Sequence, residues 1–248
     1  MGLKSKKFKD WTISYFNEVE LNEMLKELYE KKYYQFDTSK PDPVIFDVGA
    51  LIGETVLYFK ERFPRAKITA FEPSPRSFSL LKKNISRNRV TGVRLLNLAV
   101  GKVAGKMDFY IDKNENVPWG RGDSLKNTKF TNPSISKTVK VQVVRLSKYI
   151  NANVDLLKLD VEGAETEIVC EIEKKLKFVK NIILEFHESV YNPENKFSIV
   201  IGVLKKNGFR ISIYLGKWPL PEIAVILARV VLKLVSIDEY WLRIYAKH

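Results

Sequence analysis

Polar side chains able to do chemistry follow short apolar runs along this sequence. The runs have the length and composition of buried β-strands. The polar residues at or next to their ends are Asp47, Glu72, Asn97, Asp160 with Glu162, and Glu185 with His187. In an open parallel sheet the carboxyl ends of the strands meet at one edge, and ligands bind there. We therefore expect these side chains to gather in one site.

A glycine turn follows the first of these runs. Gly49 and Gly53 stand four residues apart in VIFDVGALIGETVLYF, between a strand-like run and apolar residues at helical spacing. Glycine permits a tight turn and a close approach of the backbone to a ligand, and the first N–H groups of a helix lack partners within it. The segment from Asp47 to Gly53, including Ala50, is thus expected to bind the charged part of a nucleotide-like cofactor.

Glu72 is expected to bind the ribose of that cofactor. It follows the strand-like run Lys67 to Phe71 and lies 23 positions after Gly49. This is close to the spacing at which an acid at the end of a second strand accepts hydrogen bonds from both ribose hydroxyls. The alternative is a charge that stabilises the N-terminus of the helix starting near Pro75.

Alternating strands and helices must position these residues. Strands are predicted at 44–46, 67–71, 93–100, 154–159 and 181–186, with helices between them, and final strands at 210–215 and 239–246. This order predicts a doubly wound, mostly parallel α/β sheet. Alternating apolar residues at 107–111 and 139–143 predict antiparallel additions, separated by a polar loop at 114–133.

The two ends of the chain depart from this pattern. Residues 1–40 are predicted to form an N-terminal helical extension, and residues 41–248 a Rossmann-like domain. Within the domain, 219–237 contains a helical insertion that is apolar almost all round. Because it is too short to span a bilayer, we expect it to be buried or to form a homodimer contact, with peripheral membrane contact as the alternative.

Composition indicates a globular protein of 248 residues with one large core, since 45% of residues are hydrophobic and 29% are charged. The sequence shows neither a secretory leader pattern nor about 18 consecutive apolar residues, so we expect a soluble, cytoplasmic protein. The single Cys170 excludes an internal disulfide and a cysteine zinc site. Its helical context predicts a buried, small apolar residue.

The net charge of +13 leaves nucleic acid open as a partner. Much of this charge fits the solvated face of one helix, as at Lys82, Lys83, Arg87 and Arg89. Aromatic residues are not interleaved with these basic residues, as they are in platforms that stack bases. The pattern therefore favours a basic, solvated surface over an RNA-binding surface.

Four motifs together resemble the FkbM-type methyltransferases, a branch of the S-adenosylmethionine-dependent Rossmann-like enzymes. They are FDVGALIGETVLYF, AFEPSPRSFSLLKKN, LNLAVG and LKLDVEGAE, and the resemblance covers about Val44 to Phe209. It implies a seven-stranded sheet with an antiparallel last strand, S-adenosylmethionine as cofactor, and usually O-methylation of a sugar or natural product. The sequence departs from the family at Leu51, where the family commonly has Asn.

The chemistry of methyl transfer gives the residues at the strand ends their expected roles. Asp47, Gly49, Ala50, Gly53, Glu72, Asn97 and Asp160 are the candidates for cofactor binding. Methyl transfer to a hydroxyl requires a positioned acceptor and a base. His187 is the leading base candidate, a structural role for it stays open, and Asp160 and Glu185 complete the catalytic group. A divalent-metal site formed by Asp160, Glu162, Glu185 and His187 is an alternative that the sequence does not favour, and we assign no metal ligand.

The sequence therefore predicts a methyltransferase that acts on a hydroxyl of a small molecule or glycan. An RNA methyltransferase is the runner-up because of the basic charge, although the chain lacks the Asn-Pro-Pro-aromatic tetrapeptide of base-amino methylases. A non-catalytic cofactor-binding protein is the third hypothesis, and it gains weight if Leu51 impairs the pocket.

Overall fold

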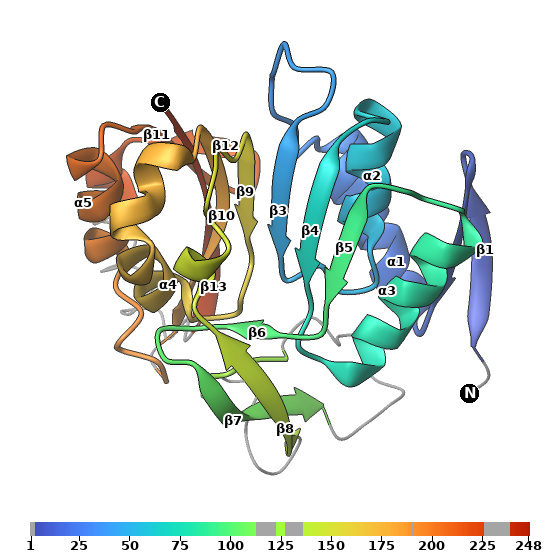
Figure 1. The fold of residues 1–248 in the computed structure, drawn as a ribbon. Coiled ribbons are helices and arrows are strands. Elements are labelled where there is room, and N and C mark those ends of the chain that lie inside the picture. The colour runs from blue at the N-terminus through green and yellow to red at the C-terminus, as the bar shows by residue number, and fades with distance from the viewer. Residues whose placement is uncertain (1–2, 113–122, 127–135, 190, 226–238) are drawn as a thin grey trace.

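The computed structural model describes residues 3–112, 123–126, 136–189, 191–225 and 239–248. An eight-stranded sheet runs through its centre in the order β12-β11-β13-β10-β9-β3-β4-β5 (Figure 1). Its strands are β3 (Val44–Val48), β4 (Lys67–Phe71), β5 (Val93–Leu96), β9 (Leu156–Leu159), β10 (Asn181–Ser189), β11 (Arg210–Leu215), β12 (Trp218–Leu220) and β13 (Glu239–Lys247). Neighbours from β10 to β5 are parallel, whereas β13 is antiparallel to both β10 and β11. The predicted doubly wound α/β class, with an antiparallel C-terminal strand, is confirmed.

Two details of the predicted sheet were wrong. The sheet has an eighth strand, because β12 folds back on β11 as a short antiparallel edge, with Gly216 at φ 58° in the turn. The strand predicted at 93–100 is divided into β5 and β6 (Ala99–Val100), and β6 pairs with β8 in a different sheet. Asn97 lies at this division, where its side-chain amide donates to the carbonyl oxygens of Glu72 at 2.8 Å and Pro73 at 3.0 Å.

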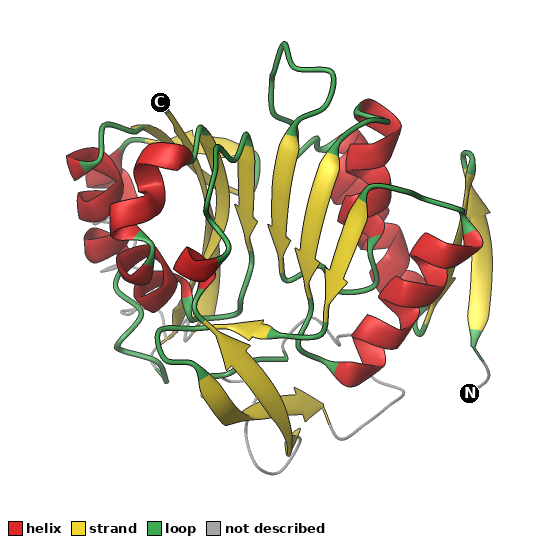
Figure 2. Cartoon of the chain, viewed as in Figure 1, coloured by secondary structure: helices red, strands yellow, loops and turns green. Residues whose placement is uncertain are grey.

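Helices cover both faces of the central sheet (Figure 2). On one face lie α1 (Glu18–Leu25), α2 (Glu54–Arg62) and α3 (Pro75–Arg87), and on the other lie α4 (Glu165–Glu171) and α5 (Phe197–Lys206). Successive residues of a strand belong to different cores: Ile45 packs with the first group of helices and Phe46 with the second. Strands buried on both faces explain why their sequences are almost continuously apolar.

A smaller sheet lies beside the carboxyl ends of the central strands (Figure 1). It consists of β6, β7 (Gly105–Asp112) and β8 (Ser136–Val144), and β7 and β8 are antiparallel as predicted. The predicted 114–133 loop lies mostly outside the described residues. Its described part, 123–126, is fixed to β7 by paired main-chain hydrogen bonds between Ser124 and Tyr110.

The N-terminal prediction was correct for residues 18–30 and wrong for residues 4–15. Residues 18–30 form α1 and a π-helical turn (Lys26–Glu30), whereas β1 (Lys4–Phe8) and β2 (Trp11–Tyr15) form a hairpin. The hairpin depends on a distant partner, because the Asn84 side chain of α3 accepts from the Ser14 N–H at 2.7 Å and donates to the Ser14 carbonyl at 3.0 Å. This segment is not a separate unit, since Leu28 shares one core with Phe59 of α2.

Two further predictions concern the C-terminal half. Residues 226–238 lie outside the described part of the chain, so the burial, dimer contact or membrane contact of the 219–237 insertion stays a prediction. Within the described ranges, no helix combines the length and apolarity needed to cross a bilayer. Cys170 was predicted to be buried, but it is exposed, because α4 turns Ile168 and Val169 inward instead.

Candidate active site

A buried lysine lies beneath the glycine turn. Lys158 of β9 and Asp47 of β3 are register partners, and their side chains occupy the sheet face that carries α2. Lys158 is 2% exposed, and its Nζ lies 2.7 Å from the Gly49 carbonyl oxygen, 3.3 Å from Asp47 Oδ1 and 3.6 Å from Asp160 Oδ2. Burial alone would lower the pKa of Lys158, but the neighbouring carboxylates raise it above its ordinary value. The lysine is therefore a fixed positive charge.

Asp47 completes this arrangement from below the turn. It is fully buried, and the Thr55 hydroxyl of α2 donates to Oδ2. Burial raises the pKa of Asp47, although Lys158 and Thr55 oppose that effect. Sequence reasoning missed Lys158, although a single charged residue within the apolar run LLKL of β9 was the available signal.

Both glycines adopt the left-handed conformations that the predicted tight turn requires, and each also has a close neighbour within the protein. Gly49 has φ 83°, and a Cβ there would lie 1.9 Å from the Asp160 carbonyl oxygen, so the close approach is to the loop after β9. The N–H groups of Gly49 and Ala50 both donate to the Phe71 carbonyl at 3.0 Å. Gly53 lets α2 pack on α3, since a Cβ would lie 2.6 Å from Leu81 Cδ1. The turn is therefore held chiefly by the protein's own main chain.

Glu72 is held by main-chain donors. The Leu51 N–H donates to Glu72 Oε2 and the Ser74 N–H donates to Oε1, each at 2.8 Å. Burial raises the pKa of Glu72 to about 8, with Asp123 adding to the rise and the two N–H donors opposing it. Above that pKa, each carboxylate oxygen has two lone pairs, so each can still accept from one ribose hydroxyl. Leu51 takes part through its backbone, so replacing the family's Asn leaves this contact intact.

A cavity opens between the strand ends. Of the predicted cofactor-binding residues, Gly49, Glu72 and Asp160 line it, whereas the structure places Asp47, Ala50, Gly53 and Asn97 outside the lining of this cavity. The described lining contains Lys158 as its one basic residue. Its acidic residues are Glu27, Glu54, Glu72, Asp123, Asp160 and Glu162. The cavity of this basic protein is thus acidic, and it suits a cation.

His187 lies behind Asp160 and Glu162, within a group of carboxylates. Its Nδ1 lies 2.8 Å from Glu165 Oε1, and its Nε2 lies 3.4 Å from Glu162 Oε2 and 4.0 Å from Asp160 Oδ1. Burial alone would lower the pKa of His187, but Glu162, Glu165 and Asp160 raise it well above 6.5. The sequence analysis did not foresee Glu165 as the partner of His187.

Glu185, the third predicted catalytic residue, is engaged elsewhere. The Tyr34 hydroxyl donates to Glu185 Oε1 at 2.7 Å, and Nε of its register partner Arg243 lies 3.6 Å from the same oxygen. Glu185 is buried and is absent from the described cavity lining, whereas Tyr34 lines the cavity. Sequence reasoning also missed Tyr34, which precedes the recognisable motifs.

Asp160, Glu185 and His187 also form the group best suited to a metal ion. One potential ligand atom from each lies within 4.8 Å of the others. Protein groups already face all three: Lys158 faces Asp160, Tyr34 and Arg243 face Glu185, and Glu165 faces His187. We assign no metal to this group.

A cavity at the carboxyl edge of a parallel sheet, with an antiparallel last strand, defines a Rossmann-like enzyme of the class I methyltransferase type. The chain belongs to the FkbM methyltransferase family, whose domain model (Methyltransferase FkbM domain) matches residues 47–211. This confirms that the chain is an S-adenosylmethionine-dependent methyltransferase of the FkbM type.

Individual relatives agree with this assignment. Methyltransferase 1 of Beauveria bassiana is 28% identical over 221 residues, which cover 83% of this chain and 87% of that protein. The 31-O-demethyl-FK506 methyltransferase FkbM of Streptomyces tacrolimicus is 28% identical over 228 residues, covering 81% of this chain and 86% of that protein. The crystal structure of a methyltransferase FkbM from Methylobacillus flagellatus KT superposes with a TM-score of 0.51 at 13% identity, over 85% of this chain and 45% of that one, and shares the fold.

Proposed function

We propose that this protein transfers a methyl group from S-adenosylmethionine to a hydroxyl oxygen of a small molecule or glycan. The acidic cavity carries the proposal, because the sulfonium and ammonium groups of the cofactor are both positive. The name of the relative from Streptomyces tacrolimicus, a 31-O-demethyl-FK506 methyltransferase, supports a hydroxyl acceptor.

The residues around the cavity fit the cofactor. Glu72 has one lone pair on each oxygen for the ribose hydroxyls, and Asp160 is the acid available to the methionine amino group. Lys158 and the turn at Gly49 keep these two strand ends together. When bound, the cofactor supplies an electrophilic methyl group on a positively charged sulfur.

His187 is the proposed base. Glu165 holds the ring at Nδ1, so Nε2 is the ring nitrogen left to accept the proton of the acceptor hydroxyl. Asp160 and Glu162, which line the cavity, face Nε2 and stabilise the imidazolium that results. We assign Glu185 no part in the reaction, because its carboxylate already contacts Tyr34 and Arg243.

Titration calorimetry with S-adenosylmethionine tests the cofactor assignment, and two variants separate its parts. We expect micromolar binding by the unmodified protein and loss of that binding in Glu72→Ala, with a thermal unfolding scan to show that the variant is folded. His187→Ala should keep its cofactor affinity and lose turnover by about 10²–10⁴-fold, the range supplied by general bases. Absence of binding at millimolar cofactor would refute the proposal. An unchanged rate in His187→Ala would show that His187 is not the base.

A further inference from the structure

Asn195 connects the elements around His187 through a fully used side-chain amide. It is 5% exposed and lies just before α5. Its Nδ2 donates to Glu165 Oε2 at 2.5 Å and to the His187 carbonyl at 2.8 Å. Its Oδ1 accepts from the Thr166 N–H at 3.0 Å and from the Thr166 hydroxyl at 2.7 Å. A side-chain amide can donate two hydrogen bonds and accept two, so the hydrogen-bonding capacity of Asn195 is fully used.

This pattern permits only one orientation of the amide. The Thr166 N–H can only donate, and the His187 carbonyl can only accept. If the amide were rotated by half a turn, Nδ2 would face an N–H and Oδ1 would face a carbonyl, and both contacts would be lost. Asn195 therefore always presents an N–H to Glu165 Oε2.

The orientation of Asn195 in turn determines which hydrogen bonds Glu165 accepts. Asn195 donates to Oε2, and the Gly163 N–H donates to Oε1 at 2.9 Å. Both oxygens of Glu165 therefore accept hydrogen bonds from N–H donors. His187 Nδ1 lies 2.8 Å from Oε1, and this geometry favours a proton on Nδ1 that is donated to Glu165.

We propose that Asn195 is a positioning residue that fixes the tautomer of His187, with the proton kept on Nδ1 and exchanged at Nε2. Nε2 is the nitrogen that faces Glu162 and Asp160, the two acids that line the cavity. The proposal rests on the proposed role of His187 as base, but the tautomer is measurable without any substrate. A failed proposal and a failed base assignment therefore give different results.

Nitrogen-15 NMR of the full chain labelled at histidine gives the direct test. The chain has two histidines, and His248→Gln removes the other set of signals. Above the pKa of His187, we expect one protonated nitrogen, assigned to Nδ1, and one bare nitrogen, Nε2. In Asn195→Ala the neutral ring should become a mixture of both tautomers. An unchanged spectrum in that variant would overturn the proposal.

Asn192→Ala is the matched control for this measurement. Asn192 is buried in the same segment and donates to the Gly163 carbonyl at 2.8 Å, and its hydrogen bonds within the described residues do not involve Glu165 or His187. We expect its spectrum to keep the tautomer of the unmodified protein. A mixture of His187 tautomers in this control as well would show that any loosening of the segment is enough to mix them. That result would overturn the specific role of Asn195.

Glu165→Leu gives a second route if Asn195→Ala does not fold. Leucine removes the acceptor that faces His187 Nδ1, so the neutral ring should lose its preference for the proton on Nδ1. Retention of the Nδ1–H tautomer there would contradict the proposal. In kinetics, Asn195→Ala should lower kcat by about 10²-fold or more with the KM for cofactor unchanged. A rise in KM at constant kcat would instead indicate a purely structural role and overturn it.

Discussion

Leu51 and Glu162 hold left-handed backbone conformations on either side of the cavity, with φ angles of 44° and 52°. Non-glycine residues in this region cost roughly 1–3 kcal/mol each, and they persist where surrounding contacts hold them. Leu51 is held by its N–H bond to Glu72, and Glu162 by a hydrogen bond from the Ser124 hydroxyl to its carbonyl at 2.5 Å. Asn adopts this conformation more readily than Leu, which accounts for the family's preference without a side-chain contact to the cofactor.

Glu162 gives a prediction about the pH dependence of the reaction. A base works only when it is unprotonated, and the carboxylates hold the pKa of His187 well above 6.5. The value of kcat/KM should therefore rise with pH through that raised pKa. Glu162→Gln removes a negative charge 3.4 Å from Nε2, so the pKa falls and the rise should move about one to three units toward lower pH.

Glu167→Gln is the matched control for that shift. Glu167 lies in α4, five residues after Glu162 (167 − 162), and its carboxylate pairs with Lys126 at 2.5 Å. Its pH profile should therefore follow that of the unmodified protein. If the Glu162→Gln profile also stays in place, Nε2 of His187 is not the group that titrates in the reaction.

At the scale of elements, the N-terminal segment closes the cavity from outside the family domain. The family match begins at residue 47, yet Met24, Glu27, Leu28 and Tyr34 line the cavity. The same segment covers two buried charges, since the Tyr34 hydroxyl donates to Glu185 and the Tyr33 ring lies 3.1 Å from the Arg243 guanidinium. The N-terminal segment therefore forms part of the cavity wall.

Tyr34→Phe tests how much the contact of this N-terminal segment with Glu185 contributes to the free energy of unfolding. The change removes a donor from the buried Glu185, and a buried group that loses its partner costs about 1–3 kcal/mol. Tyr29→Phe removes the same hydroxyl from the same segment, but its partner Glu61 lies at the surface, so we expect a loss below about 0.5 kcal/mol. Urea unfolding of both variants measures the difference. Equal losses in the two variants would mean that the buried Tyr34–Glu185 hydrogen bond stabilises the fold no more than the exposed Tyr29–Glu61 hydrogen bond does.

The elements that could be predicted from sequence are those whose signals are local. β4 and β11 match their predicted bounds, and the stripe Ile168, Ile172, Leu176 and Val179 is buried as expected. The β1–β2 hairpin could not be predicted, because its lysine-rich strands depend on Asn84 and Asn88, which lie some 70 residues later. The departure of β6 from the central sheet likewise depends on pairing with β8.

The site was predictable to the extent that topology alone places residues. The rule for strand ends correctly placed Glu72 and Asp160 at one cavity. It could not tell which acids face the cavity and which are occupied by partners, because that depends on register and on remote segments. Glu185 shows this, since its partners Tyr34 and Arg243 lie 151 and 58 residues away in the chain (185 − 34 and 243 − 185).

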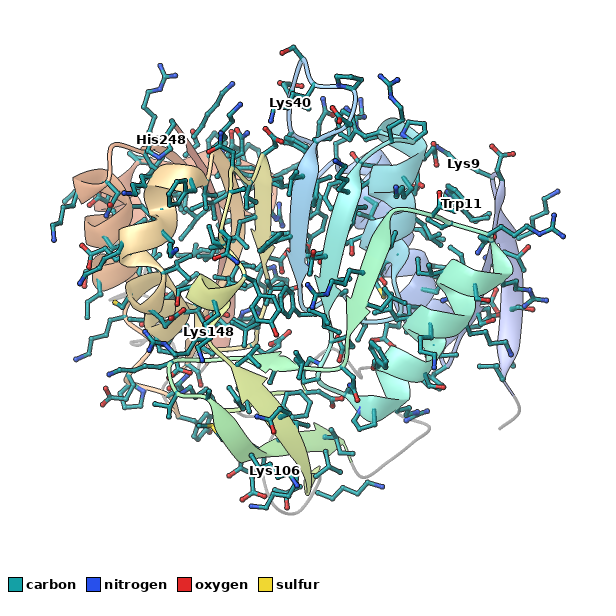
Figure 3. The ribbon with its side chains drawn as sticks, in the orientation of Figure 1. Lys9, Trp11, Lys40, Lys106, Lys148 and His248 are labelled. Atoms are coloured by element: carbon teal, nitrogen blue, oxygen red, sulfur yellow. The ribbon has the colours of Figure 1, made fainter. Side chains whose placement is uncertain are left out.

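For the whole molecule, the basic charge and the acidic cavity occupy different places. The net charge is +13, and Figure 3 shows Lys9, Lys40 and Lys106 at separate parts of the periphery. Scattered lysines give a general attraction to polyanions that weakens steeply with salt, and the described cavity lining holds one basic residue, Lys158. The acids around the cavity repel phosphates at the proposed place of methyl transfer. Charge at this scale therefore favours a non-nucleic-acid acceptor.

Incubating the protein with a cell extract and S-adenosylmethionine labelled at the methyl group tests this conclusion. We expect the label in a fraction that resists ribonuclease and that base treatment does not release, as the ether bond of an O-methylated sugar or small molecule requires. RNA binding, if measured in parallel, should be weak at 0.15 M salt, with Kd in the range of about 10⁻⁴–10⁻⁶ M typical of non-specific binding. Label that ribonuclease digestion converts to nucleotides would instead make RNA the acceptor. The surface lysines would then have to guide a single strand past the acidic rim formed by Glu27, Asp123 and Glu162.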